Sequence, residues 1–359
     1  MKKEKYIKIG LIFILLLFFM VQSIYAQKEP FRVGTTTANF LEIGYGSAGN
    51  GMGDAVVSTV NDLSAIYWNP AGLSYMRQNS VQFMLQPWIA DINTMFASVG
   101  MVMPRYGTFA VGIYQVDYGR EEVTTMDLQE GTGERYSAMD YCFSLSFGRK
   151  LTDWFAFGAS TKLVSSRIWH TSANAFALDL GAIVNTQFFS PTGNREDGMS
   201  IGMSISNYGT RMKYDGMDLL QPIDPTPNQA GDFDNVEGQY KTQGWELPLI
   251  FRLGFAIHPI VSGNNKLTLE VDALHPNNNS ESINVGAQYQ YTIPSFGSFY
   301  LRTGYKGLFM DSSEYGLAFG TGVIYRMRSL NNMALRIDYA YRDIGLLGTS
   351  NCYTFTFVF

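Results

Sequence analysis

The feature that most constrains the fold of this chain is an alternation of apolar and polar residues that recurs from residue 80 to its end. The segment LIFRLGFAIH at 249–258 alternates between large apolar side chains and a second face that carries Arg252, Gly254 and His258. A period of two is the pattern of a β-strand. Several segments are about ten residues long, the length that a tilted strand needs to cross a bilayer. Fourteen such segments are centred near residues 85, 98, 112, 144, 160, 180, 203, 253, 270, 287, 302, 320, 338 and 355.

The two faces of these segments differ in a way that indicates a membrane barrel. The apolar faces are rich in aromatic residues and nearly free of charge, as in Phe143, Leu145 and Phe147. The opposite faces carry Gly, Ser and the charged residues Arg252, Glu270, Asp272, Arg302, Lys306, Arg336 and Asp338. Apolar outside and polar inside is the inverse of a water-soluble barrel. We therefore expect an all-β fold, a transmembrane antiparallel β-barrel of about 14 strands, with these charged residues facing its lumen.

A soluble β-sandwich would also alternate and is the alternative to a barrel. The charged fraction of 16% is below the ~25% of typical soluble proteins. The chain ends in YTFTFVF at Phe359, and this aromatic end resembles the last strand of bacterial outer-membrane barrels. Both features favour the membrane barrel.

The links between the segments give an independent indication of orientation. Links after even-numbered segments are expected to be short, including those around Pro104-Arg105-Tyr106 and Gly193-Asn194-Arg195, whereas the two longest, roughly 119–137 and 208–247, follow odd-numbered segments. An even strand count places both termini in the periplasm and both long links outside the cell. The acidic, proline-containing link 208–247 lacks the spacing of an EF-hand, so we interpret it as a solvated surface loop.

The first residues indicate export. Four Lys precede an apolar run from Ile9 to Val21, and a cleavage site follows at Ala26. This run is too short to span a bilayer, so residues 1–26 are predicted to be a signal peptide. Their loss changes the formal charge from −5 to −8, and an acidic chain without a basic cluster is a poor nucleic-acid binder. We divide the chain into the signal peptide, an N-terminal hatch segment at 27–78 and a barrel at 79–359.

Several patterns that could carry chemistry do not fit their usual context. Gly44–Gly49 matches G-x-G-x-x-G but does not lie in a βαβ unit, so its glycines are expected to permit close packing of a loop. The histidines, His170, His258 and His275, lack zinc-ligand spacing, and the sequence has no G-x-S-x-G elbow. Cys142 and Cys352 are expected to be ordinary buried thiols. No enzyme activity, cofactor or metal is predicted.

The segment GSAGNGMGDAVVSTVNDLSAIYWNPAGL, with LTLEVDALHPNN, LRTGYK and the closing LRIDYAYRDIGLLGTSNCYTFTFVF, resembles the PorV/PorQ family of outer-membrane proteins, relatives of the FadL-type channels. Asp54 and the closing CYTFTFVF depart from the pattern expected of that family. The resemblance implies that the N-terminal segment folds inside the barrel as a hatch. The residues it assigns to the hatch are Gly51, Met52, Gly53, Trp68, Asn69, Pro70 and Gly72.

Within this hatch, individual residues have expected local roles. Pro70 biases Asn69 toward extended geometry and so makes a corner. Gly72 is expected to permit close approach to the barrel wall, and buried Trp68 needs a partner for its indole N–H. Asp54 is expected to cap a short helix, and Asp62 or Ser64 to start a further turn. The segment could gate the lumen or only support folding.

The resemblance leaves three functions open for a protein that sits in outer-membrane lipid. A PorV-type protein is implied to act in type IX secretion, where it binds secreted cargo through its C-terminal sorting domain and passes it to the translocon. A FadL-type relative is implied to be a passive channel for hydrophobic small molecules, with an apolar pocket at the hatch and a side opening in the wall. The third possibility is a scaffold without a ligand.

Overall fold

The computed structural model describes residues 32–225, 228, 236–327 and 333–359. The expected signal peptide, 1–26, lies outside these residues. None of the helices in the described part of the chain has the length and apolar character to cross a membrane.

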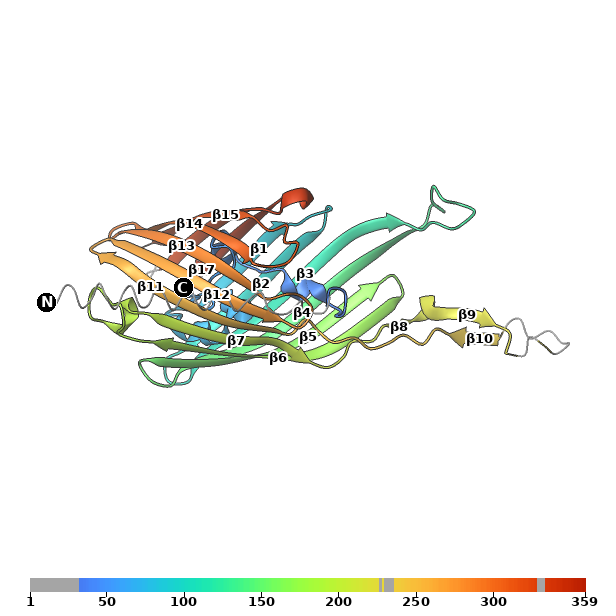
Figure 1. The fold of residues 1–359 in the computed structure, drawn as a ribbon, viewed down its shortest axis with the longest axis horizontal. Helices are drawn as coiled ribbons and strands as arrows, with labels where there is room; N and C mark the ends of the chain where they lie inside the picture. The colour runs from blue at the N-terminus through green and yellow to red at the C-terminus, as the bar shows by residue number, and fades with distance from the viewer. Residues whose placement is uncertain (1–31, 226–227, 229–235, 328–332) are drawn as a thin grey trace.

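Fourteen strands of the described chain close into an antiparallel barrel (Figure 1). Each strand pairs with its neighbour in sequence, β17 pairs with β1, and β7 pairs with β11. Every predicted segment centre falls within a strand, so the predicted fold and strand number are confirmed. The strands are β1 (Ser80–Pro87), β2 (Asn93–Met103), β3 (Gly107–Glu122), β4 (Arg135–Lys150), β5 (Phe155–Ile168), β6 (Thr171–Asn185), β7 (Ser200–Gly209), β11 (Ile250–Ser262), β12 (Asn265–Pro276), β13 (Ser282–Ile293), β14 (Gly297–Leu308), β15 (Leu317–Met327), β16 (Met333–Asp343) and β17 (Thr349–Val358).

The alternation along each strand separates an exposed apolar face from a buried face. In β11, Phe251 and Phe255 are exposed, whereas Arg252 and Ala256 between and beside them are buried. The same pattern holds in β1, β2, β4 and β17. Because the exposed side chains are mostly aliphatic or aromatic, the outer surface of the barrel suits contact with lipid.

The two ends of the barrel differ, as Figure 1 shows. The end that carries the C-terminus has short turns after β2, β4, β11 and β13. The opposite end carries both long links as projections: the β3–β4 hairpin, and a ribbon of β9 (Leu220–Ile223) and β10 (Val236–Gln239) preceded by β8 (Asp215–Gly216) and the 3-10 helix η5 (Met217–Leu219). The two long links lie together at one end, as the alternation of short and long links predicted.

Two predicted link lengths are wrong. The link expected at 119–137 is shorter, because β3 continues to Glu122 and β4 already begins at Arg135. The link after β6 is expected to be a short turn around Gly193, but it runs from 186 to 199 and includes the 3-10 helix η4 (Arg195–Asp197). Gly193 lies at a bend within this longer loop and does not by itself connect the two strands.

We expect Phe255→Arg to impair insertion of the barrel into lipid. Phe255 is 43% exposed on the outer face, and an Arg at the bilayer midplane costs about 2–4 kcal/mol. The measurement is the folded fraction in vesicles, read as the heat-modifiable band on gels. Phe255→Leu is the control and should insert like the unmodified chain; equal insertion of the Arg variant would show that the faces are assigned wrongly.

Candidate functional site: the filled lumen

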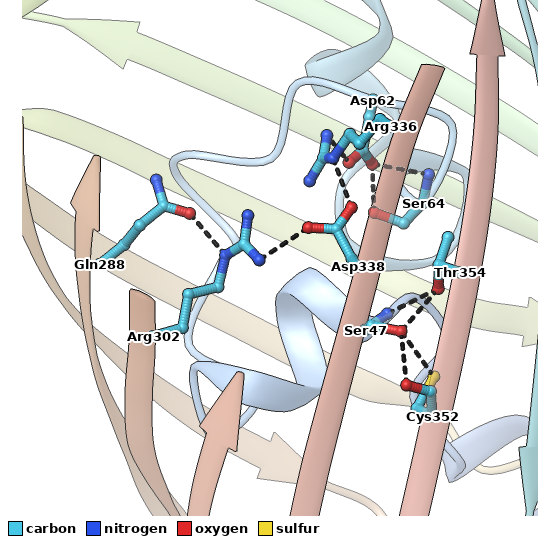
Figure 2. A network of polar contacts seen from close by, with 9 residues as sticks. All are labelled: Ser47, Asp62, Ser64, Gln288, Arg302, Arg336, Asp338, Cys352 and Thr354. Atoms are coloured by element: carbon cyan, nitrogen blue, oxygen red, sulfur yellow. Dashed lines mark hydrogen bonds and ion pairs between the residues drawn. The ribbon is translucent and has the colours of Figure 1, made fainter. Parts of the chain in front are cut away.

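The described part of the hatch segment, residues 32–78, lies inside the barrel and contacts opposite sides of its wall. Ser47 donates its backbone N–H to Thr354 Oγ1 on β17 at 2.9 Å (Figure 2), and Asn69 Nδ2 donates to the carbonyl of Ala182 on β6 at 3.1 Å. The short helices of this segment are η2 (Asn39–Glu42), α2 (Ser47–Gly51), α3 (Ala65–Trp68) and η3 (Pro70–Tyr75).

The hatch segment runs the length of the lumen. At the end with the projections, Thr37 donates its N–H to the carbonyl of Glu246 at 3.0 Å. At the end with the C-terminus, the Tyr75 hydroxyl accepts a hydrogen bond from Asn185 Nδ2 at 2.8 Å. The barrel interior is therefore occupied from one mouth to the other.

An aromatic cluster forms the centre of the hatch segment. Trp68 is 2% exposed, and its indole N–H donates to the carbonyl of Tyr45 at 2.9 Å. The ring of Tyr45 lies 4.4 Å from Tyr67, 4.6 Å from Phe96 and 4.5 Å from Tyr114, between ring centroids. Aromatic pairs at these separations add to the stability gained from burial alone.

The G-x-G-x-x-G pattern serves this cluster. A Cβ at Gly44 would lie 2.5 Å from the Trp68 ring, and one at Gly49 would lie 2.8 Å from its Nε1. Both distances are below van der Waals contact, so only glycine fits at either position. This agrees with the prediction that these glycines permit close packing.

The corner at Asn69 and Pro70 rests on a row of wall glycines. Gly148 on β4, Gly158 on β5 and Gly181 on β6 are direct cross-strand partners. A Cβ at Gly148 would lie 2.7 Å from the Pro70 carbonyl oxygen, and Cβ atoms at the other two would collide with Pro70 and Asn69. The backbone of the hatch segment thus lies directly against the backbone of the wall.

Two further glycine pairs continue this contact around the barrel. Gly202 and Gly254, partners on β7 and β11, face Val57 and Ser58, and Gly286 and Gly304, partners on β13 and β14, face Met52. Next to them, Gly320 of β15 lies against Gly51, and Gly53, with φ +64°, lies against Tyr305 of β14.

Asn69 has the extended geometry expected before proline, with φ −165° and ψ 106°. Its side chain donates to the Val57 carbonyl at 2.8 Å and accepts from the Ala71 N–H at 3.1 Å. The expected role of Gly72 is wrong: a Cβ there would lie 2.5 Å from the Val60 carbonyl oxygen, within the hatch segment itself. It is the wall that supplies the glycines at the corner.

Glu270 and Asp272, both predicted to face the lumen, accept hydrogen bonds from the hatch backbone. Asp272 Oδ2 accepts from the N–H groups of Val56 and Val57 at 2.8 and 3.0 Å. Glu270 Oε1 accepts from the N–H and the hydroxyl of Ser58 at 2.7 and 2.6 Å. Both side chains are buried, and their oxygens satisfy backbone N–H groups that would otherwise lie unpaired inside the barrel. They hold a stretch of hatch backbone that has no strand partner.

Lys306 contacts the hatch segment through Asp54. Lys306 Nζ lies 2.9 Å from Asp54 Oδ2, and Arg342 of β16 pairs with Asp54 Oδ1. Asp54 has φ 65° and does not cap a helix, contrary to the prediction; it is the anionic partner of two wall cations.

Arg336, Asp338 and Arg302 form a second polar network (Figure 2). Arg336 Nη1 lies 2.8 Å from Asp62 Oδ2 of the hatch segment, and its Nε pairs with Asp338. Arg302 lies 2.7 Å from Asp338 Oδ1 and donates to Gln288 Oε1 at the same distance. Asp62 also accepts the N–H of Ser64 at 2.9 Å, as expected at the start of a turn.

Arg252, the remaining predicted residue, lies under the aromatic cluster. Its guanidinium is 5.1 Å from the centre of the Tyr67 ring and 5.9 Å from that of Trp68, and Nη1 donates to Ser206 Oγ at 2.8 Å. A cation in a buried site over aromatic faces gains from the ring quadrupoles. All seven predicted polar residues therefore face the lumen. They form separate groups of polar contacts, which are spread around the hatch segment.

Sequence analysis missed three charged residues of the lumen that the structure brings into ion pairs, Arg342, Lys162 and Asp179. Arg342 has the same strand parity as Arg336 and Asp338 in β16, and this parity could have identified it. Lys162 and Asp179, on β5 and β6, pair at 2.5 Å, and Lys162 also donates to Asn207 Oδ1 at 2.8 Å. This pair lies where the β6–β7 register shifts between Leu178 and Leu180.

The other residues considered for chemistry do not assemble. His170 pairs with Asp218, His258 with Thr268 and His275 with Glu281, at three separate places. Within the described ranges, no three His, Cys, Asp or Glu side chains form a group that could hold a metal ion. Cys142 and Cys352 are buried free thiols.

Comparison with protein-family models and with curated proteins gives no match. Solved structures do match. A Pseudomonas aeruginosa FadL homologue aligns over 92% of this chain and 98% of its own, with a TM-score of 0.50 and 13% identity. The Pseudomonas putida toluene transporter TodX aligns over 88% and 96%, with a TM-score of 0.51 and 12% identity.

A third structure, the CymD monoaromatic hydrocarbon channel, aligns over 88% of this chain and 96% of its own, with a TM-score of 0.54 and 11% identity. The chain has a FadL-like fold. At such identities the likeness concerns the fold alone. The expected FadL-like barrel is thereby confirmed, whereas the narrower PorV/PorQ assignment stays a prediction.

We expect Gly158→Ala to displace the hatch segment of this FadL-like barrel without preventing strand pairing. The new methyl group collides with the Pro70 backbone, and overpacking of this kind costs about 1–3 kcal/mol. Conductance in planar bilayers should rise while heat-modifiable mobility is kept. Gly244→Ala is the matched control, because its Cβ would lie 3.6 Å from its nearest neighbour; conductance equal to that of the control would contradict the wall contact.

We expect Asp54→Asn to loosen the attachment of the hatch segment. It leaves Arg342, which is buried, and Lys306, which is half-buried, without their shared anion, and breaking a buried pair costs about 3–5 kcal/mol. Conductance in planar bilayers should rise while the heat-modifiable band is kept. Conductance equal to that of the unmodified protein would show that these ion pairs do not hold the segment.

Proposed function

We propose that this protein is an outer-membrane channel for small hydrophobic molecules, with the hatch segment as its gate. The observation that carries the proposal is a lumen filled by a segment that the wall holds through ion pairs and hydrogen bonds. Such contacts depend on direction. A shift of the segment can therefore break or replace them one at a time. The wall itself is closed by its own strand ladder and does not depend on them.

The aromatic cluster supports the class of substrate. Tyr45, Tyr67, Trp68, Phe96 and Tyr114 are buried side by side inside the barrel. An apolar solute that binds against these rings would move from water to an apolar aromatic surface, and this transfer is favourable. TodX and CymD are described as a toluene transporter and a monoaromatic hydrocarbon channel, which favours aromatic hydrocarbons as the first compounds to test.

The proposal includes a location and a domain division. Residues 1–26 act as a signal peptide, and the mature chain, with hatch segment 27–78 and barrel 79–359, sits in the bacterial outer membrane. The exposed apolar face of the strands contacts lipid, and the projections that carry β3–β4 and β9–β10 face the cell exterior. The turns beside the C-terminus then face the periplasm.

Type IX secretion is the second candidate. It is supported by the sequence resemblance to PorV/PorQ and by the β9–β10 ribbon, which extends beyond the barrel and exposes Ile223 and Val236. In this alternative, the ribbon and the β3–β4 hairpin would bind the C-terminal domain of a secreted cargo or the translocon. The hatch segment would then have no part in small-molecule uptake.

Replacing Trp68, Asn69 and Pro70 together by Gly, Ser and Gly distinguishes the two candidates. The change removes the indole hydrogen bond and the corner, so we expect a folded barrel with raised conductance and faster uptake of toluene into cells. Secretion should be unaffected. Loss of secretion with unchanged uptake would favour the second candidate, and a chain that fails to form the heat-modifiable band would show that the segment is needed for folding.

A further inference from the structure

The loop after β6 is the exception among the turns at the C-terminal end, and its own hydrogen bonds hold it in place. Thr186 donates its N–H to the Met199 carbonyl at 2.9 Å, and Met199 donates back to Phe188 at 2.8 Å. Asp197 pairs with Lys266 of β12 at 3.3 Å. The loop is therefore a folded structure that leans on the neighbouring wall.

A cavity of about 410 Å³ lies between this loop and the turn after β4. It is lined by Trp154, by residues 184–188 and by Arg195, which contributes a cation. The backbone N–H of Asn185 donates to the Trp154 carbonyl at 2.8 Å and ties the two turns together.

The position of the cavity points to a membrane interface. Val184 is the cross-strand partner of Phe155, and above it Ala182 is the partner of Phe157, on the apolar outer face. At the rim, Phe188 and Phe189 are 68% and 76% exposed. Aromatic residues at this level are typical of the boundary between hydrocarbon and headgroups.

The charges of Arg195 and of the residues that neighbour the cavity lining in sequence fit a headgroup that carries both signs. Arg195 makes no ion pair with any described residue, and a guanidinium binds phosphate oxygens in a bidentate manner. Glu196 follows it in the chain, and Asp153 precedes Trp154; both are exposed. An anionic headgroup would meet these carboxylates, whereas an ammonium group would be attracted to them.

We propose that this cavity binds one zwitterionic phospholipid of the periplasmic leaflet, such as phosphatidylethanolamine. The phosphate lies at Arg195, the amine faces Glu196 and Asp153, and one acyl chain runs past Trp154 along Val184. The proposal rests on membrane insertion as part of the proposed function, and it does not depend on transport or on the hatch segment.

The test is native mass spectrometry of the full-length mature protein with phosphatidylethanolamine, phosphatidylglycerol or inorganic phosphate. We expect one phosphatidylethanolamine to be retained in preference to phosphatidylglycerol, and inorganic phosphate not to displace it. Loss of one charged hydrogen-bonding group should make Arg195→Gln about tenfold weaker. Phe188→Ser should also weaken retention, and Arg105→Gln, on the turn after β2, is the control and should not.

Equal retention by Arg195→Gln and the unmodified protein would overturn the proposal, as would stronger binding of phosphatidylglycerol. Displacement by inorganic phosphate would show an anion site without lipid recognition. The heat-modifiable band is recorded for each variant, so that a protein that never inserts is distinguished from an inserted barrel without a lipid site. Insertion failure of the unmodified protein would count against the proposed function itself.

Discussion

The contact between two backbones, that of the hatch segment and that of the barrel wall, is the constraint on which the rest of this structure depends. Cross-strand glycines such as Gly148, Gly158 and Gly181 remove the side chains that would otherwise separate the two. At this distance, the buried N–H groups of the segment must find acceptors nearby. For Val57 and Ser58, which lie against Gly202 and Gly254, these acceptors are Asp272 and Glu270 of β12, the strand that pairs with β11. The glycines that allow the close approach and the carboxyl groups that accept the hydrogen bonds therefore lie on neighbouring strands.

The ionic contacts specify where the segment sits. Asp54 and Asp62 meet cations of β14 and β16, while the wall carboxylates meet backbone N–H groups. Buried ion pairs contribute little net stability compared with apolar packing, since both charges lose their hydration. Their strong dependence on geometry means that a shifted segment would leave several charges without partners. The polar lumen thereby selects one position for a chain that has few regular elements of its own.

The sequence was sufficient to predict the barrel because a period of two reports directly which face each residue occupies. It predicted the fourteen strands and the inward side of Arg252 and Asp338 from that rule alone. It could not predict that Arg336 meets Asp62 or that Lys306 meets Asp54, because such partners lie far apart in the chain and follow no period. The local signals were ambiguous for the same reason. Asp54 resembles a helix cap, Gly72 a wall contact, and Gly193-Asn194 a short turn, and each has another role in the folded chain.

The contacts of α2 have a consequence for the order in which the molecule can form. This short helix packs against β14, β15, β16 and β17, and Ser47 donates its hydroxyl to the carbonyl of Cys352, 305 residues further along the chain. Contacts between such distant positions form slowly, because the loop between them must first be closed. The wall contacts of α2, an early element of the described chain, are complete only when β17 is in place. The hatch segment therefore cannot take its final position before β17 pairs with its neighbours β16 and β1.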